Sequence, residues 1–292
     1  MTFLPIEHLL DYRHRTFRQA PDLRLKTKEQ AIDFVNERGF VYFWPIKGIL
    51  LPSLWTAVAG NRPVADAHDD PGHVTWGWKD SLLGTRSWYY GKVLRKKATI
   101  ISLEVAPYFY ALSENYGSLE EDYLTLYEQG RLTQEAKAIY EALLTQGVLD
   151  TVALRKATHM TSVESDPRFE RALVNLQSDF KIIPVGVTDS GAWKYAFAYD
   201  IVARHFPKLP DQAQSIQERQ ARAHLTDLYL RSVGAAQMRD IKRLFGWPPV
   251  EIEIAVTSLI QDRILLSSIE IEGEAGEWFA HANLFDGRVT HS

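Results

Sequence analysis

The spacing of apolar and polar positions predicts mainly helices in the first third of the chain. An amphipathic helix is expected over residues 5–16. A second helix begins after Thr27 and Gln30, which have the spacing of a capping box, and it ends at Gly39. The aromatic and β-branched residues 40–44 then favour a strand. Further expected elements are a helix over 50–59, a buried strand over 98–105 and a short helix over 107–117.

Residues 118–206 are predicted to form three helices and a β-hairpin, which is the order of a winged helix. The apolar positions of the first helix lie on one face and stop at Gly147. Strands over 182–187 and 193–199 are joined by a turn at 189–191. The helix starts are marked by a capping box at Ser118 and Glu121, by an N-cap at Asp150, and by Asp166 followed by Pro167.

Residues 213–286 repeat this order, although the two units share no residue-level repeat. The expected elements are helices over 213–232, over 235–245 and from Pro248 onward, and strands over 264–272 and 277–284. The chain is therefore predicted to be an α+β protein, mostly helical, made of tandem winged-helix modules. The expected domains are a clear module over 118–210, another over 211–292, and an elaborated N-terminal third copy with a basic and aromatic insertion over 1–117.

Composition narrows the chemistry. The chain has no cysteine, which excludes disulfides, thiolate metal sites and cysteine nucleophiles. Its start does not read as a signal peptide, and no apolar run approaches the roughly 20 residues that span a bilayer. We therefore expect a cytoplasmic protein with no membrane partner. The net charge is −4, but residues 1–118 hold 15 Lys and Arg against 12 Asp and Glu, so a basic surface is expected in the first third.

Residues 66–104 combine acids, histidines, rings and cations, and the mixture suits a nucleic-acid partner. In the alternative interpretation the rings belong to the core and the cations form a solvated strand end. The third helix of the 118–210 module adds two cations, whereas Glu251 and Glu253 make the third helix of the last module unsuited to phosphate. The residues expected to contact DNA are Trp76, Trp78, Lys79, Arg86, Trp88, Tyr90, Lys92, Arg95, Lys96, Lys97, Arg168 and Arg171.

Three segments, WPIKGILLPSLWTAVAG (44–60), KVLRKKATIISLEVAPYFYAL (92–112) and RSVGAAQMRDIKRLFGW (231–247), resemble the AlkZ/YcaQ group of bacterial winged-helix proteins. The resemblance implies tandem winged helices that bind duplex DNA, including damaged duplexes, and DNA-repair glycosylases that excise alkylated or cross-linked bases. It implies no cofactor. It also makes the stretch 66–104 the wing and strand of the first module, facing DNA.

In that group a Gln-x-Gln or Gln-x-Asp pair supplies catalysis, and this chain has Phe43-Trp44-Pro45 at the matching positions. A glycosylase would then need another acid to position water and stabilise an oxocarbenium-like state. The candidates are Glu104, Asp70 and Asp69, which are the acids nearest the basic and aromatic stretch.

Each candidate acid also has a structural interpretation. Glu104 suits a salt-bridged strand residue, and Asp69-Asp70-Pro71-Gly72 suits a capped turn. His68, Asp70 and His73 carry side chains that bind metals, but their spacing is loose, so no metal site is predicted. The competing function is a DNA- or partner-binding protein that keeps the scaffold without glycosylase activity.

Overall fold

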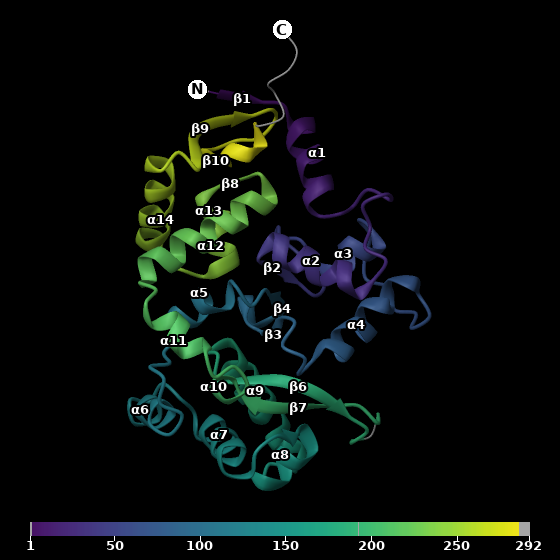
Figure 1. Cartoon of the computed structure of the whole chain (residues 1–292), viewed down its shortest axis with the longest axis vertical. Coiled ribbons are helices and arrows are strands. Elements are labelled where there is room, and N and C mark those ends of the chain that lie inside the picture. The colour runs from purple at the N-terminus through teal and green to yellow at the C-terminus, as the bar shows by residue number, and fades with distance from the viewer. Residues whose placement is uncertain (1, 192, 286–292) are drawn as a thin grey trace. The chain divides into compact units, whose positions relative to one another are not determined.

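The computed structural model describes residues 2–191 and 193–285, in which more residues are helical than extended (Figure 1). The mixed α and β class expected from the sequence is confirmed. Two compact units are present. The first comprises Met1–Thr75, Ile100–Ser102 and Gln217–Ser292, and the second comprises Trp76–Thr99 and Leu103–Ile216. The predicted domain boundaries, 1–117, 118–210 and 211–292, stay a prediction.

The N-terminal part of the first unit follows the local signals closely. The Thr27 side chain accepts a hydrogen bond from the Gln30 backbone N–H at 3.3 Å, and the helix ends at Gly39, whose φ is +80°. The elements of this part are α1 (Ile6–Thr16), α2 (Lys28–Arg38), β2 (Phe40–Tyr42), α3 (Leu54–Ala59) and the 3-10 helix η1 (Pro71–His73).

The C-terminal part of the first unit contains a four-stranded sheet with the order β1-β9-β10-β8. Strand β1 (Thr2–Leu4), which the sequence did not suggest, runs parallel to β9 and pairs Thr2 with Ile269. The other strands are antiparallel neighbours. The remaining elements are α12 (Glu218–Val233), β8 (Ala235–Ala236), α13 (Met238–Phe245), α14 (Pro249–Gln261), β9 (Leu265–Ile271), β10 (Trp278–His281) and η4 (Ala282–Leu284).

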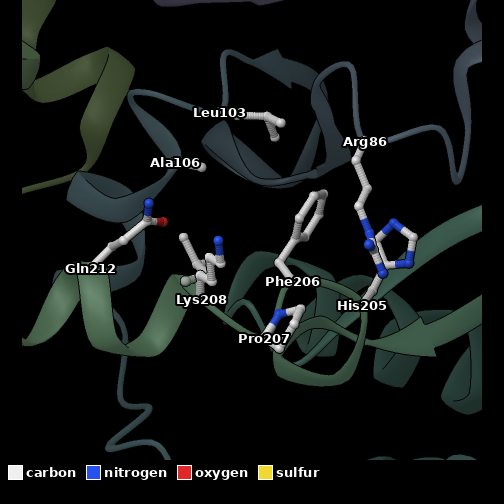
Figure 2. Close-up of a pocket in the computed structure, with 9 residues that line it drawn as sticks. Arg86, Leu103, Ala106, His205, Phe206, Pro207, Lys208 and Gln212 are labelled. Atoms are coloured by element: carbon white, nitrogen blue, oxygen red, sulfur yellow. The ribbon is translucent and has the colours of Figure 1, made fainter.

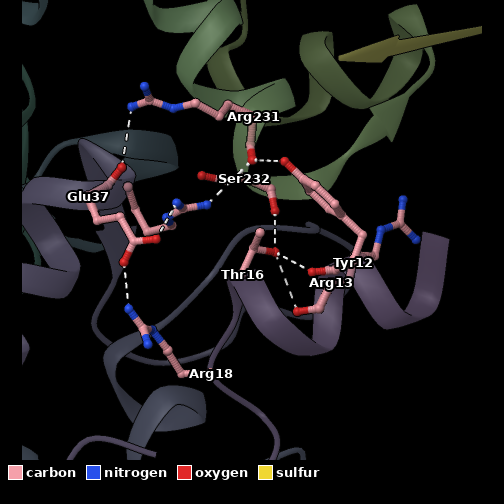
Figure 3. Close-up of polar contacts among 8 residues, drawn as sticks. Tyr12, Arg13, Thr16, Arg18, Glu37, Arg231 and Ser232 are labelled. Atoms are coloured by element: carbon pink, nitrogen blue, oxygen red, sulfur yellow. Dashed lines mark hydrogen bonds and ion pairs between the residues drawn. The ribbon is translucent and has the colours of Figure 1, made fainter. Parts of the chain in front are cut away.

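Helix α1 satisfies the carbonyl groups at the C-terminal end of α12 (Figure 3). The Tyr12 hydroxyl donates to the carbonyl of Arg231 at 2.7 Å, and the Thr16 hydroxyl donates to that of Ser232 at 2.7 Å. Arg13 Nε donates to the carbonyl of Val233 at 2.9 Å. These carbonyls have no partner inside a helix, so side chains from a distant segment of the sequence complete the helix end.

The second unit packs helices against a three-stranded sheet of order β5-β7-β6. Leu143, Phe169 and Leu176 are fully buried in its core, as their helical spacing predicts. Two elements are divided between the units, α4 (Val74–Leu82) and β4 (Ala98–Ile101). The other elements of the second unit are β3 (Tyr89–Lys92), η2 (Leu94–Lys96), α5 (Ala106–Ala111), α6 (Asp122–Glu128), α7 (Gln134–Gln146), β5 (Leu149–Asp150), α8 (Thr151–Ala157), η3 (Val163–Ser165), α9 (Asp166–Ser178), β6 (Ile182–Thr188), β7 (Ala196–Ile201), α10 (Val202–His205) and α11 (Leu209–Gln214).

Several local predictions are wrong. Val74–Leu82 is a helix and not a wing or strand, because its buried residues Thr75, Lys79 and Leu82 recur at the spacing of one helical face. Only half of the capping box at Ser118 is seen: the Ser118 hydroxyl accepts from the Glu121 backbone N–H at 3.2 Å, but the helix begins only at Asp122. Asp166 is the first residue of α9 and pairs with Arg155 at 2.5 Å, so it does not act as the N-cap. The helix predicted over 213–232 is broken between α11 and α12.

None of the helices in the described part of the chain has the length and apolar character needed to span a bilayer.

The buried ammonium group of Lys181 provides a test of the second unit. It donates to Asn115 Oδ1 at 2.8 Å, and burial lowers the pKa of Lys181 to about 8. The folded state therefore binds fewer protons than the unfolded state between about pH 8 and pH 10.5, so stability rises with pH across this window.

We expect the free energy of unfolding of the wild type, relative to Lys181→Met, to rise by about 2 kcal/mol between pH 7.5 and 9.5. Denaturant melts of both proteins at each pH measure this difference, in which the titration of other groups cancels. A difference that stays flat across the window would contradict the lowered pKa.

Candidate nucleic-acid interface

Lys79 is the predicted DNA contact that the structure buries most completely. Its side chain is 1% exposed, and its ammonium group donates to Asp80 Oδ1 at 2.5 Å and to the Tyr195 hydroxyl at 2.8 Å. The same nitrogen lies 4.5 Å from the ring centroid of Phe197 and 4.7 Å from that of Trp76. Burial lowers the pKa of Lys79, and Asp80 acts in the opposite direction. This lysine therefore holds α4 against β7 and does not present a charge to solvent.

The rings of the same stretch divide into a buried set and an exposed one. Trp88 is 3% exposed and Tyr90 is buried, and burial raises the pKa of Tyr90 well above its usual value. Trp78 is half-buried, whereas Trp76 is 37% exposed on α4. Trp76 is thus the ring of the predicted set with the most surface available for a base.

Most of the predicted cations lie on the surface. Arg95 and Lys96 are exposed on η2, and Lys97 is exposed just after it. Arg86 is also exposed, whereas Lys92 is half-buried. Arg95 and Lys96 both have left-handed backbone conformations, with φ of +52° and +57°. Non-glycine residues rarely adopt this conformation, so the tight turn carries a local conformational cost.

The turn at η2 lies against α9, where the other two predicted cations are found. Lys96 Nζ donates to Asn175 Oδ1 at 2.7 Å. Arg168, Arg171 and Asn175 are spaced three and four residues apart, so they share one face of α9. Arg171 is exposed, and Arg168 is exposed but pairs with Glu135 at 3.2 Å. We call Lys96, Arg168 and Arg171 the basic face.

A cavity of about 330 Å³ lies elsewhere in the second unit (Figure 2). We call it the Phe206 pocket. Arg86 and Lys208 supply two cations, and the apolar lining surrounds the half-buried Phe206 ring. The complete lining comprises Arg86, Leu103, Ala106, His205, Phe206, Pro207, Lys208, Leu209 and Gln212.

The pocket side chains are held by neighbouring rings and by a tight turn. The Phe206 ring lies 6.0 Å from the Tyr89 ring at an interplanar angle of 28°, and the His205 ring meets its edge at 4.6 Å and 81°. Burial lowers the pKa of His205, and the positive charge of Arg86 lowers it further. The imidazole is therefore favoured in its neutral form, which both donates and accepts a hydrogen bond.

The three candidate acids have different surroundings. Glu104 is exposed, its neighbour Leu103 lines the Phe206 pocket, and its carboxylate has no hydrogen-bond or ion-pair partner among the residues that the structure describes. Asp70 accepts from Arg62 at 2.5 Å and from the backbone N–H of Gly72 at 2.7 Å. The Arg62 hydrogen bond chiefly lowers the pKa of Asp70.

The first unit holds the remaining polar candidates of the stretch. Asp69 is exposed, next to Asp70, which is engaged as the cap of η1. His73 Nε2 lies 2.9 Å from the carbonyl oxygen of Ala65. Across residues 2–191 and 193–285, no group of three His, Asp or Glu side chains is arranged to hold a metal ion.

Several surface and pocket residues were missed by the sequence interpretation. His205, Phe206, Lys208 and Gln212 lie more than a hundred positions from Arg86 in the sequence, so no local pattern joins them. Trp193, in the β6–β7 connection, is 91% exposed. The sequence holds a signal for this exposure, because Trp193 follows a turn sequence and precedes Lys194. The prediction instead places Trp193 in a strand.

Comparison with known proteins gives two matches. The sequence model of the family described as AlkZ related matches residues 25–246. No match was found among curated proteins. Among solved structures, the Streptomyces sahachiroi DNA glycosylase AlkZ is similar, with a TM-score of 0.61 and 13% sequence identity over 97% of this chain and 71% of that one. At this identity the likeness establishes a shared fold.

The Gly84–Arg86 turn beside the pocket requires glycine at its first position. Gly84 has φ of +74°, and a Cβ atom there would lie 2.4 Å from the carbonyl oxygen of Val185. Gly130 has a similar φ of +70° but open space around it. The two positions therefore separate the cost of the backbone conformation from the cost of a collision.

We expect Gly130→Ala to cost about 1 kcal/mol of stability and Gly84→Ala to cost about 2 kcal/mol more, because a backbone atom must move. Chemical denaturation of the two variants beside the wild type gives both values. Equal losses of stability at the two positions would show that the backbone of β6 moves away from the new Cβ atom at little cost.

Proposed function

The chain belongs to the AlkZ-related family, and we propose that it is a tandem winged-helix protein that binds duplex DNA and acts in the repair of alkylated or cross-linked bases. The observation that carries the proposal is the basic face, in which Lys96 of η2 lies beside Arg168 and Arg171 of α9. The named activity of the similar Streptomyces protein, a DNA glycosylase, supports the repair role.

The order of elements supports the winged-helix interpretation. In the second unit, α7, β5, α8, α9, β6 and β7 follow one another, and the short strand β5 pairs with β7, so the sheet order is β5-β7-β6. In the first unit, α12, β8, α13, α14, β9 and β10 have the same order, and β8 pairs with β10. The run α2, β2, α3, α4, β3 and β4 repeats the order along the chain and supports the elaborated third copy.

The position of the basic face within its module gives it a role. Helix α9 is the third helix of the proposed module, and third helices of this class enter the major groove. Lys96, Arg168 and Arg171 would contact phosphates and set the register on the duplex. The wing is the β6–β7 hairpin, and the exposed Trp193 in its connection would lie against a groove or sugar surface.

The last module has different charges at the corresponding helix. Glu251 and Glu253 lie in the first turns of α14, and Glu251 pairs with Arg222 at 3.4 Å. Carboxylates at this end repel phosphate. We therefore assign duplex binding to the module that carries α9.

Glu104 is the strongest of the three candidates for a catalytic acid in this proposal. Its carboxylate is exposed and has no partner among the described residues, so it is available to a substrate. Asp70 is held by Arg62 and by the N–H of Gly72, which is the arrangement of a capped turn. Asp69 has an exposed carboxylate beside this turn and ranks between them.

For DNA binding, we compare Lys96→Gln/Arg171→Gln with the matched pair Arg239→Gln/Lys242→Gln, which removes two exposed cations from α13. The first pair should weaken binding to a paired duplex and reduce the slope of log affinity against log salt by about 2, since each phosphate contact contributes about 0.9. Fluorescence anisotropy between 50 and 200 mM salt measures both quantities. Affinity that is independent of salt, or equal losses in both pairs, would count against the basic face.

For glycosylase activity, we expect Glu104→Gln to slow the release of alkylated purines from duplex DNA by about 10² to 10⁴, the usual contribution of general acid–base catalysis. Asp70→Asn should keep the rate within a few-fold, because that carboxylate serves a turn. Single-turnover base release, measured by chromatography, gives each rate. Absence of release by the wild type from every alkylated and cross-linked duplex would favour the non-catalytic alternative.

A further inference from the structure

We propose that the Phe206 pocket binds one nucleoside monophosphate unit, with its base against Phe206 and its phosphate at one of the two cations that flank this ring, Arg86 and Lys208. The pocket lies wholly within the second unit and is distinct from the basic face. Free-nucleotide binding there is independent of the proposed function, whereas capture of a nucleotide from DNA rests on it.

The charges around the pocket select an anion. Of the nine described residues that line it, two are permanent cations at neutral pH and none is acidic. Glu104 and Asp211 are neighbours of lining residues in the sequence but are not part of the lining. A guanidinium group offers two parallel N–H donors to phosphate oxygens, and an ammonium group adds a compact positive charge.

The remaining lining suits a planar ring attached to that anion. The Phe206 ring stands in the middle of the pocket, with Arg86 and His205 on one side and Lys208 and Gln212 on the other (Figure 2). Leu103 and Pro207 add apolar walls. Stacking of a base on an aromatic ring contributes about 1–3 kcal/mol, so a ligand with both a base and a phosphate uses more of this surface than inorganic phosphate does.

Polar groups are available for the edge of the base. The Gln212 amide offers a donor and an acceptor, and the neutral imidazole of His205 offers one of each. The volume of about 330 Å³ is at the lower end of small-ligand sites, which run from about 300 to 1,000 Å³. A single nucleotide fits that range, and a duplex does not enter.

The arrangement is built before a ligand arrives. The backbone of Arg86 has φ of +58°, an uncommon conformation for a residue other than glycine. Gly84 lies against β6 in the turn, and the Tyr89 ring stacks with the Phe206 ring. Conformational cost of this kind gathers at binding sites, where the surrounding fold maintains it.

Calorimetric titration of the full chain tests the site with four probes, namely dAMP, dGMP, deoxyadenosine and inorganic phosphate. We expect each monophosphate to bind at least about tenfold more tightly than deoxyadenosine or phosphate, since each of these lacks one of the two contacts. Arg86→Gln/Lys208→Gln should weaken monophosphate binding about tenfold or more, whereas Arg239→Gln/Lys242→Gln should leave it unchanged.

Two further variants separate binding from folding. Phe206→Leu should reduce monophosphate affinity and leave the affinity for inorganic phosphate unaltered, because it removes only the stacking ring. If Arg86 cannot be replaced without unfolding the protein, Lys208→Gln alone removes one cation at an exposed position and should still weaken monophosphate binding. Thermal melts confirm that each variant is folded.

A DNA arm identifies the source of the nucleotide. A duplex with one extrahelical nucleotide is compared with the fully paired duplex, using the same variants. Preference for the extrahelical duplex that disappears in Arg86→Gln/Lys208→Gln assigns the pocket to a nucleotide of the DNA chain. Monophosphate binding without that preference assigns it to a free nucleotide.

The inference is overturned if the pocket variants alter neither monophosphate binding nor the preference for the extrahelical duplex. Failure of the proposed function has a different signature. In that case the paired duplex does not bind, or binds without responding to Lys96→Gln/Arg171→Gln, while the mononucleotide titrations are unaffected.

Discussion

One buried ammonium group joins two segments of the second unit that are far apart in the sequence, α4 and the start of β7. Lys79 lies among aromatic rings and forms its ion pair with Asp80, next to the hydroxyl of Tyr195. Taking a lysine out of water is costly, and the paired carboxylate together with the rings offsets that cost. Removal of the ammonium would leave Asp80 and Tyr195 without their shared donor. The Gly84–Arg86 turn and β3 follow α4 directly in the sequence.

The basic face and the Phe206 pocket use different chemistry within one unit. On the basic face the cations are exposed, two along α9 and one on the adjoining η2, so they suit the repeated charges of a nucleic-acid backbone. In the pocket, the cations stand beside a ring and an amide, so they suit a single small ligand. In the proposed function, the first kind of contact would hold the duplex and the second would hold a single nucleotide.

Local signals in the sequence were read correctly where neighbours along the chain determine the structure. Thr27 and Asp150 cap helices as predicted, and Gly39 and Gly147 end them, because each contact spans only a few residues. Lys79 and Lys96 look alike in the sequence, yet Lys79 is buried against Tyr195. Because Tyr195 lies 116 positions away, no local pattern predicts this burial. The same distance problem hid the Phe206 pocket and the pairing of β1 with β9.

The pairing of β1 with β9 has a consequence for how the chain is made. Strand β1 pairs Thr2 with Ile269, so during synthesis it has no strand partner until β9 has been made. The second unit is nearly continuous in sequence and can collapse earlier, while the first unit is completed only by Gln217–Ser292. During that interval the apolar face of α1 and the open edge of β1 are what a nascent-chain chaperone would have to shield.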